Sequence, residues 1–225
     1  MLQILTKMTG ETARAYITRV LLYNIVNLNL LPGEQIQETE LCAQLQVSRT
    51  PVREAILELA QIKIIDIYPQ RGTYVSLIDS AMVEEVRYMR YVLESDLAAV
   101  ACDMISQQDI DFLYENIQLQ KLYNERNADK MMQLDDQFHY RIYQICGKEF
   151  LHDMVTRVAA HFDRTRKLSY IVKQPVLIVE DHEQLVKALK NGNKDKAREI
   201  SKIHMCRSIE DAPLLKAKYP DYYVS

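Results

Sequence analysis

The chain has 225 residues, of which 48% are apolar and 26% are charged. This composition is typical of a folded globular protein and excludes a largely disordered chain. The length accommodates one or two domains. With 28 cations and 31 acids the net charge is −3, so no overall basic excess indicates nucleic acid, although a local basic patch remains compatible with this balance.

The N-terminus has neither the apolar core nor the cleavage pattern of a signal peptide. The longest apolar stretch, residues 21–31, is interrupted by three asparagines and is shorter than the roughly 20 residues that span a membrane. We therefore expect a cytoplasmic protein without a membrane partner. No cysteines form a CxxC pair, and all four are expected to be buried as small apolar residues in a reducing compartment. They are Cys42, Cys102, Cys146 and Cys206.

The first 76 residues predict three helices followed by a β-hairpin. Apolar residues recur with helical spacing over residues 13–28, and Pro32 and Gly33 end that helix. The remaining elements are a short helix with Leu41 and Leu45, a third helix capped by Ser48, a strand at 64–68, a loop at 69–72 in which Gly72 can take a positive φ, and a strand at 73–76. This order is the layout of a winged helix-turn-helix, in which the third helix recognises DNA and the hairpin is the wing. We assign residues 1–78 to this domain.

The start of the third helix carries groups that suit DNA. Free backbone N–H groups and the helix dipole favour a phosphate there, and the hydroxyls of Ser48 and Thr50 can add phosphate bonds. Arg49 and Arg53 are four residues apart on one face, where an arginine can form two parallel bonds with guanine O6 and N7. Arg71, at the hairpin tip, can contact phosphate or the minor groove.

The alternative is that these arginines are ordinary surface cations. Residues 1–76 hold seven cations and seven acids, so the domain is neutral. A neutral domain predicts modest non-specific DNA binding and a dependence on dimerisation.

From residue 79 onward every segment has a helical period, which predicts an all-helical bundle over residues 79–225. Ser106 and Asp109 resemble a capping box at one helix start. Further helices are expected at residues 128–146, 149–171, 175–190 and 194–209, with Pro213 beyond the last.

One carboxylate and three histidines are expected on the inward faces of this bundle. Asp135 and His139 are four residues apart and share a face, while His182 and His204 lie on the apolar stripes of two later helices. If these side chains converge, nitrogen and oxygen ligands of this kind suit Zn, Ni, Mn or Fe better than Ca or Mg. The alternative is that each histidine is a hydrogen-bonded core residue without a metal.

Four motifs in the first domain together resemble the DNA-binding domain of GntR-family bacterial transcription regulators. They are residues 31–36 (LPGEQI), 40–41 (EL), 47–55 (VSRTPVREA) and 71–75 (RGTYV). The resemblance implies that Arg49, Thr50, Arg53 and Gly72 contact operator DNA.

Two positions depart from the GntR pattern. Lys63 stands where the family usually has glycine, so the third helix is expected to end differently, because a non-glycine residue in a left-handed cap costs on the order of 1 kcal/mol. Thr39 replaces a common arginine, so the operator sequence cannot be copied from relatives.

The helical half resembles the FCD effector domain of the FadR-type GntR branch over about residues 80–212. The motifs are residues 85–101 (EVRYMRYVLESDLAAVA), 134–139 (LDDQFH), 181–189 (DHEQLVKAL) and 204–205 (HM). The resemblance implies an antiparallel helical bundle and a divalent metal held by Asp135, His139, His182 and His204. It also implies an arginine, Arg90, that binds an acidic effector.

Arg90 has an alternative role, because it lies four residues before Glu94 and the two can form a purely structural ion pair. The planar guanidinium nevertheless suits the carboxylate of a small organic acid.

Together these patterns predict a ligand-responsive transcription regulator, more often a repressor in this family, that binds a two-fold operator as a homodimer. A small organic acid would bind at the open positions of the metal. A ligand-blind regulator with a structural metal is one alternative. A metal-dependent hydrolase is the other, but it lacks a placed general base, because Asp136 points about 100° away from its neighbour. We expect no enzyme.

Overall fold

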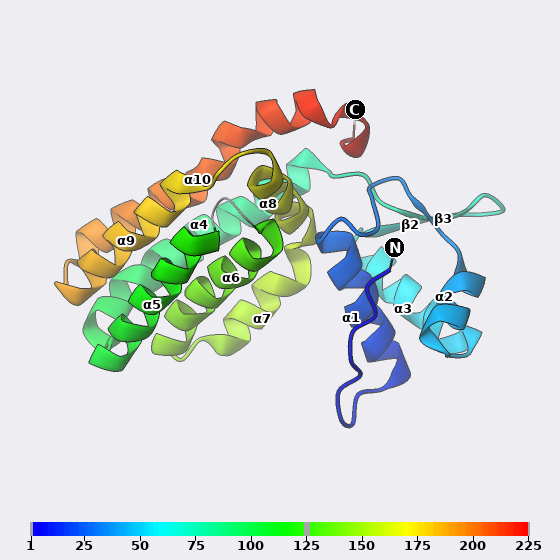
Figure 1. Cartoon of the computed structure of the whole chain (residues 1–225), viewed down its shortest axis with the longest axis horizontal. Helices are drawn as coiled ribbons and strands as arrows, with labels where there is room; N and C mark the ends of the chain where they lie inside the picture. The colour runs from blue at the N-terminus through cyan, green and yellow to red at the C-terminus, as the bar shows by residue number, and fades with distance from the viewer. Residues whose placement is uncertain (1, 124–126, 225) are drawn as a thin grey trace. The chain divides into compact units, whose positions relative to one another are not determined.

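The structure is a computed structural model that describes residues 2–123 and 127–224, and Figure 1 shows its helices and strands. The chain divides into two compact units. The first comprises Met1–Ser80 together with Tyr219–Ser225, and the second comprises Ala81–Lys218.

The first unit contains the predicted three helices and hairpin. Its elements are α1 (Ala13–Val26), β1 (Gln35–Ile36), α2 (Glu38–Leu45), α3 (Arg49–Gln61), β2 (Ile65–Tyr68) and β3 (Gly72–Val75). The short strand β1 was not predicted. It pairs with β3 to complete an antiparallel sheet of order β1-β3-β2.

A single apolar core holds α1 and α2 against α3. The side chains at its centre come from α1 and α3, and the largest of them are Ile17, Val20, Leu21, Ile25, Val52, Ile56 and Leu59. Ser48 occupies the N-cap position of α3 as predicted, but its side chain makes no capping hydrogen bond. The exposed hydroxyl is therefore available to another partner.

The end of α3 differs from the expectation. Lys63 adopts the left-handed conformation with φ of 59°, and its N–H donates to the carbonyl of Ala60 at 3.0 Å. The next N–H, of Ile64, donates to the carbonyl of Leu59 at 3.0 Å. These two bonds satisfy carbonyls that the helix end would otherwise leave free, so the helix ends as it would with glycine despite the cost of the lysine side chain.

The chain's last residues belong to the first unit. The N–H of Ile78 donates to the carbonyl of Tyr222 at 2.7 Å, and the N–H of Val224 donates to the carbonyl of Ile78 at 3.1 Å. Tyr223 and Ile78 are both buried. The segment with Tyr219, Tyr222 and Tyr223 is thus a packed part of the first unit.

The second unit is all-helical in the residues that the structure describes. Its elements are α4 (Ser80–Met104), α5 (Gln107–Tyr123), α6 (Ala128–Ile145), α7 (Glu149–Val158), α8 (Ala160–Val172), α9 (Val176–Lys190) and α10 (Lys194–Lys218). Helix α9 packs against α5 and α10, while α6 packs against α5 and α8. Ser106 and Asp109 form the predicted capping box, with the Asp109 N–H donating to Ser106 Oγ at 3.2 Å and the Ser106 N–H donating to Asp109 at 2.9 Å.

Two helix predictions in this unit were wrong. The segment 149–171 is two helices, α7 and α8, that meet at Ala159. Helix α10 does not end at residue 209 but continues through Pro213 to Lys218. Proline removes one backbone hydrogen bond, but the helix continues because Leu215 is fully buried and Asp211 pairs with Ser169 and Lys173.

The cysteine expectation holds for one residue of four. Cys146 is buried, whereas Cys42, Cys102 and Cys206 are half-buried, and all four are free thiols. Each of these three follows a buried residue, so it lies at the border of its helix's inward face. Among the described residues, no helix has the length and apolar character that a membrane crossing requires.

The wing turn gives a test of backbone geometry. Gly72 has φ of +125°, and a Cβ atom there would lie 2.7 Å from Gln35 Nε2. We expect Gly72→Ala to lower the free energy of unfolding by about 1–3 kcal/mol, since a residue held in so rare a conformation costs about that much. Urea denaturation measures the loss.

Gly33→Ala is the control, because Gly33 has φ of +82° but a Cβ atom there would make only an ordinary contact of 3.5 Å with Leu77. Its expected cost is about 1 kcal/mol. Equal losses in the two variants would contradict a special constraint at the wing.

Candidate metal centre and DNA-recognition segment

The residues predicted to contact DNA lie at the start of α3 and on the wing. Ser48, Arg49, Thr50 and Arg53 follow one another along the first turns of α3, and all four side chains are exposed. Gly72 begins β3 and is half-buried, and the exposed Arg71 precedes it at the hairpin turn. The structure thus leaves these groups open to a partner, and their roles stay predictions.

Ion pairs divide the cations of the first unit into two kinds. Arg14 and Arg19 pair with glutamates, and Arg53 Nε lies 2.9 Å from Glu38 Oε2. Arg49 and Arg71 have no ion-pair partner within the described part of the chain. Although the domain is neutral overall, Arg49 and Arg71 thus place cations without an ion-pair partner at the helix start and at the wing tip.

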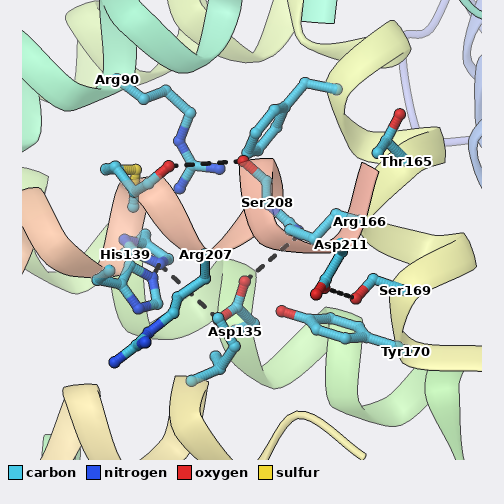
Figure 2. Close-up of a pocket in the computed structure, with 14 residues that line it drawn as sticks. Arg90, Asp135, His139, Thr165, Arg166, Ser169, Tyr170, Arg207, Ser208 and Asp211 are labelled. Carbon is cyan, nitrogen blue, oxygen red and sulfur yellow. Dashed lines mark hydrogen bonds and ion pairs between the residues drawn. The ribbon is translucent and has the colours of Figure 1, made fainter. Parts of the chain in front are cut away.

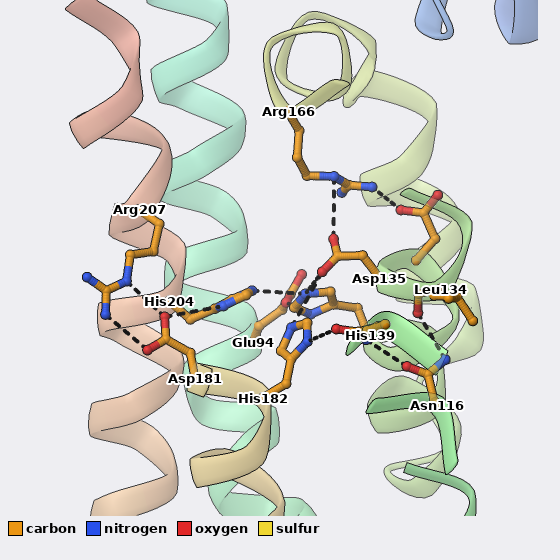
Figure 3. A network of polar contacts seen from close by, with 12 residues as sticks. Glu94, Asn116, Leu134, Asp135, His139, Arg166, Asp181, His182, His204 and Arg207 are labelled. Carbon is orange, nitrogen blue, oxygen red and sulfur yellow. Dashed lines mark hydrogen bonds and ion pairs between the residues drawn. The ribbon is translucent and has the colours of Figure 1, made fainter. Parts of the chain in front are cut away.

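The predicted carboxylate and three histidines converge on one point of the second unit. Asp135 and His139 come from α6, His182 from α9 and His204 from α10. All four are buried, and one ligand atom of each lies within 4.8 Å of the others. Asp135 Oδ1 is 3.5 Å from His182 Nε2 and 3.8 Å from His139 Nε2, which is 3.1 Å from His204 Nε2. We call these four residues the His/Asp cluster (Figure 3).

Buried atoms of the cluster lack hydrogen-bond partners. Among the described residues, Asp135 Oδ1 and His182 Nε2 are both fully buried without one. An unsatisfied buried polar atom costs about 1–3 kcal/mol, so two that face each other require an explanation. A metal ion would satisfy both, since two bonds of about 2.1 Å place ligands up to about 4.2 Å apart. Nitrogen and carboxylate donors together fit a divalent transition metal.

A buried carboxylate orients the first histidine. Glu94 Oε2 lies 2.7 Å from His139 Nδ1, while Glu94 Oε1 accepts from Arg90 Nε at 2.7 Å and from the Tyr143 hydroxyl at 3.4 Å. Burial alone would raise the pKa of Glu94, but the positive charge of Arg90 and the contacts with Arg90 and His139 outweigh it and hold this pKa well below its usual range. The ionised Glu94 accepts a hydrogen bond from His139 Nδ1, so His139 Nε2 is the nitrogen that faces the cluster.

The other two histidines face polar groups through their outer nitrogens. His182 Nδ1 lies 2.9 Å from Gln120 Oε1, whereas His204 Nδ1 lies 3.7 Å from Asp181 Oδ2, an ion-pair distance that is too long for a hydrogen bond. Two bonds from Arg207, of 2.9 and 3.0 Å, hold Asp181 in place. Burial lowers the pKa of His182 well below its ordinary value and also lowers the pKa of His204. Both rings are therefore neutral at pH 7, which is the form that binds metals.

Arginine balances the cluster's own carboxylate. Arg166 Nε lies 3.4 Å from Asp135 Oδ2, and the same guanidinium pairs with Asp136 and Asp163. Burial alone would raise the pKa of Asp135. The Arg166 charge and the nearby histidines lower it by more than burial raises it, so this pKa is below its usual range. For Asp163 burial prevails and raises the pKa to about 6.

Two cavities border the cluster, of about 40 Å³ and about 120 Å³. Since one water needs about 10–15 Å³, the smaller cavity has room for a few water-sized groups and the larger for several. Arg90, His139 and Arg166 line both cavities, and Figure 2 shows these side chains in the first. Arg90 forms the ion pair with Glu94 that the structural alternative predicted, yet its Nη1 has no hydrogen-bond partner in the described residues.

The matched families cover both units. Residues 15–75 match the model of bacterial regulatory proteins of the gntR family, and residues 85–207 match the FCD domain. The chain belongs to the GntR family, with an FCD domain. It is 31% identical over 209 residues to the HTH-type transcriptional repressor RspR of Escherichia coli, covering 92% of each chain.

Solved structures agree on the fold. Escherichia coli McbR/YncC has a TM-score of 0.76 at 22% identity and covers 93% of this chain and 99% of its own. A GntR regulator from Rhodococcus has a TM-score of 0.69 at 19% identity, with 94% and 99% covered. The two family models and the relative RspR, rather than these structures, show that the chain is a DNA-binding transcription regulator of the GntR/FCD type and not an enzyme, which sets the hydrolase alternative aside.

Several polar residues that surround the cluster were not predicted from the sequence. The i,i+4 spacing of Asn116 and Gln120 on the apolar face of α5 was a signal, because buried amides there need partners. No local signal pairs Asp181 with His204 or Arg166 with Asp135, since each contact joins different helices.

The buried imidazoles predict a pH dependence of stability in the metal-free protein. An unfolded histidine takes up a proton near pH 6.5, whereas folded His182 does not, so stability falls as pH falls through that value. For His182 the contribution between pH 7.5 and 5.5 is about 1.4 kcal/mol. We expect the free energy of unfolding in chelator to fall by that much more in the wild type than in His182→Gln.

Asp163 acts in the opposite direction, because its raised pKa of about 6 favours the folded state as pH falls. Its contribution is shared by both proteins and cancels in the difference. The same pH dependence in wild type and His182→Gln would mean that His182 takes up its proton in the folded state as readily as in the unfolded chain.

Proposed function

We propose that this regulator is a metal-dependent repressor that responds to a small organic acid and binds a two-fold operator as a homodimer. The observation that carries the proposal is the His/Asp cluster: four buried ligands from three helices, with Asp135 Oδ1 and His182 Nε2 unsatisfied. Asp135, His139, His182 and His204 would hold a divalent Zn, Ni, Mn or Fe ion. When bound, the ion would supply a Lewis-acidic positive charge for a carboxylate effector.

The adjoining cavities support an acidic effector. The buried Arg90 and the half-buried Arg166 bring guanidinium groups to both cavities, and the half-buried Arg207 brings a third to the first. Planar guanidinium groups bind carboxylates through paired hydrogen bonds. Glu94 fixes Arg90 through Nε at 2.7 Å, which leaves Nη1 to donate to the effector. The structural ion pair and effector binding are thus compatible roles of one arginine.

The exposed groups of the first unit support the DNA-binding proposal. Arg49 and Arg53 would contact base edges, Ser48, Thr50 and Gly72 the sugar–phosphate backbone, and Arg71 the phosphate or minor groove. Glu38 holds Arg53 Nε at 2.9 Å and leaves its two terminal nitrogens for guanine.

Two observations support the homodimer and the repressor roles. Tyr88, Val92, Val100 and Met104 on α4 are exposed apolar side chains, which a second copy would cover. The relative RspR is named a repressor. A ligand-linked change in DNA affinity requires that the effector bind the DNA-bound and free proteins with different affinity.

Arg53→Ala tests the DNA contact. We expect operator affinity to fall by about 1–3 kcal/mol and base preference to relax at one position. The measurement is fluorescence anisotropy with duplexes selected from a random pool and with their single-base variants. Arg14→Ala is the matched control, because Arg14 is an exposed α1 arginine paired with Glu58 at 3.6 Å, outside the recognition helix. An equal loss of affinity for all duplexes would assign Arg53 to a phosphate instead.

Thermal unfolding with a panel of small mono- and dicarboxylates tests the effector site. An acid at 100 times its dissociation constant stabilises the protein by about 2.7 kcal/mol, and we expect that shift with Zn²⁺ present but not after chelation or in His182→Ala.

His161→Ala is the control, since His161 is a buried α8 histidine outside the cluster, and the acid-induced shift should persist in it. A midpoint that responds to chelation but to no acid would favour the ligand-blind regulator. A midpoint that changes with neither chelation nor any acid would mean that the three histidines are core residues without a metal.

A further inference from the structure

Three buried side chains link a backbone carbonyl to the His/Asp cluster. Asn116 Nδ2 donates to the carbonyl oxygen of Leu134 at 3.1 Å, Gln120 Nε2 donates to Asn116 Oδ1 at 2.6 Å, and Gln120 Oε1 lies 2.9 Å from His182 Nδ1. Asn116 is 3% exposed, and Gln120 and His182 are 0% exposed, so water does not compete for these bonds. Figure 3 shows the start of this chain at Leu134 and Asn116 and its end at His182.

The hydrogen bonds from Leu134 to His182 can run in only one donor-to-acceptor direction. A carbonyl oxygen can only accept, so Asn116 must turn its NH₂ group toward Leu134 and its oxygen toward Gln120. That oxygen also only accepts, so Gln120 must direct its own NH₂ group to Asn116. Gln120 Oε1 is then left to face His182 Nδ1, and the proton between them must belong to the imidazole. A neutral imidazole has one N–H, so His182 Nε2 carries a lone pair toward Asp135, 3.5 Å away.

The other two histidines do not need such an anchor. Glu94 and Asp181 present carboxylates to His139 and His204, and an ionised carboxylate accepts whichever oxygen it presents. An amide can turn over and donate instead, which would place the His182 proton on Nε2. Only the amide partner therefore requires a second residue to fix its orientation.

We propose that Asn116 and Gln120 are positioning residues of the metal centre, which transmit the polarity of the Leu134 carbonyl to His182 and hold its Nε2 lone pair toward the His/Asp cluster. Their role in metal binding rests on the proposed function, but the protonated nitrogen of His182 is a property of the metal-free protein. Partners of metal-bound histidines commonly change metal affinity 10–100-fold when they are altered.

Long-range ¹H–¹⁵N correlation spectra of the metal-free full chain test the proposal. In the wild type we expect His182 Nδ1 to be pyrrole-type and Nε2 pyridine-type, with the signals assigned by their loss in His182→Gln. Asn116→Leu frees the Gln120 amide to turn, so the other tautomer should appear. Zn²⁺ affinity, measured by competition with a chromophoric chelator, should then fall about tenfold or more.

Two further variants separate positioning from packing. Leu113→Val alters a fully buried residue of the same helix and should leave both the tautomer and the Zn²⁺ affinity unchanged. Adding Gln120→Glu to Asn116→Leu replaces the amide by a carboxylate that needs no anchor, and it should restore the Zn²⁺ affinity.

A wild-type spectrum with His182 Nε2 protonated would overturn the proposal, even if no variant folds. So would an unchanged tautomer in Asn116→Leu, or equal losses of Zn²⁺ affinity in Asn116→Leu and Leu113→Val. If wild-type His182 has the expected tautomer but the protein binds no Zn²⁺, the proposed metal centre fails. The tautomer would still support the proposed orientation of the hydrogen bonds, so the two failures are distinguishable.

Discussion

Burial of the Asp135 carboxylate is the constraint on which the helical unit depends. Its Oδ2 faces Arg166 at 3.4 Å, but its Oδ1 faces imidazole nitrogens and has no hydrogen-bond partner among the described residues. A buried charge with half of its hydrogen-bonding capacity unused destabilises a fold. The fold retains it because three helices bring the carboxylate and the three histidine rings to the same point, which a cation would complete. Metal binding and folding of this unit would then be linked.

The surrounding polar residues serve this point in two ways. Glu94 supplies charge and orientation to His139 and Asp181 supplies charge to His204, while the neutral Gln120 supplies orientation alone to His182. Both carboxylates and guanidinium groups line each of the two adjoining cavities, so neither charge is in large excess there. Such balance would let a charged effector enter at the cost of rearranged ion pairs instead of unpaired buried charges.

Much of this arrangement could be predicted because it is encoded locally. The periods of three and four residues gave the helices, and the spacing of Asp135 and His139 gave one edge of the cluster. The resemblance to FCD domains joined these residues to His182 and His204. The DNA-binding unit was still more accessible, because its turn and cap residues form short, ordered motifs whose elements lie where they were expected.

What escaped prediction depends on contacts between distant segments. Strand β1 has two residues and exists because β3 pairs with it. Pro213 lies inside α10 because tertiary contacts of Asp211 and Leu215 outweigh one lost hydrogen bond. The left-handed Lys63 shows the same balance, since its backbone bonds offset a conformation that its side chain disfavours. In each case a local preference of about 1–3 kcal/mol yields to the packed fold.

The most direct test of the account is the metal content and ligand set of the purified protein. Elemental analysis should find one divalent transition-metal ion per chain, and X-ray absorption at that metal's edge should show imidazole nitrogens and a carboxylate oxygen with no sulfur. Asp135→Ala should lose the ion while His161→Ala, outside the cluster, should keep it. Protein that stays metal-free after incubation with Zn²⁺, Ni²⁺, Mn²⁺ or Fe²⁺, or that binds the ion through cysteine sulfur, would contradict the central claim.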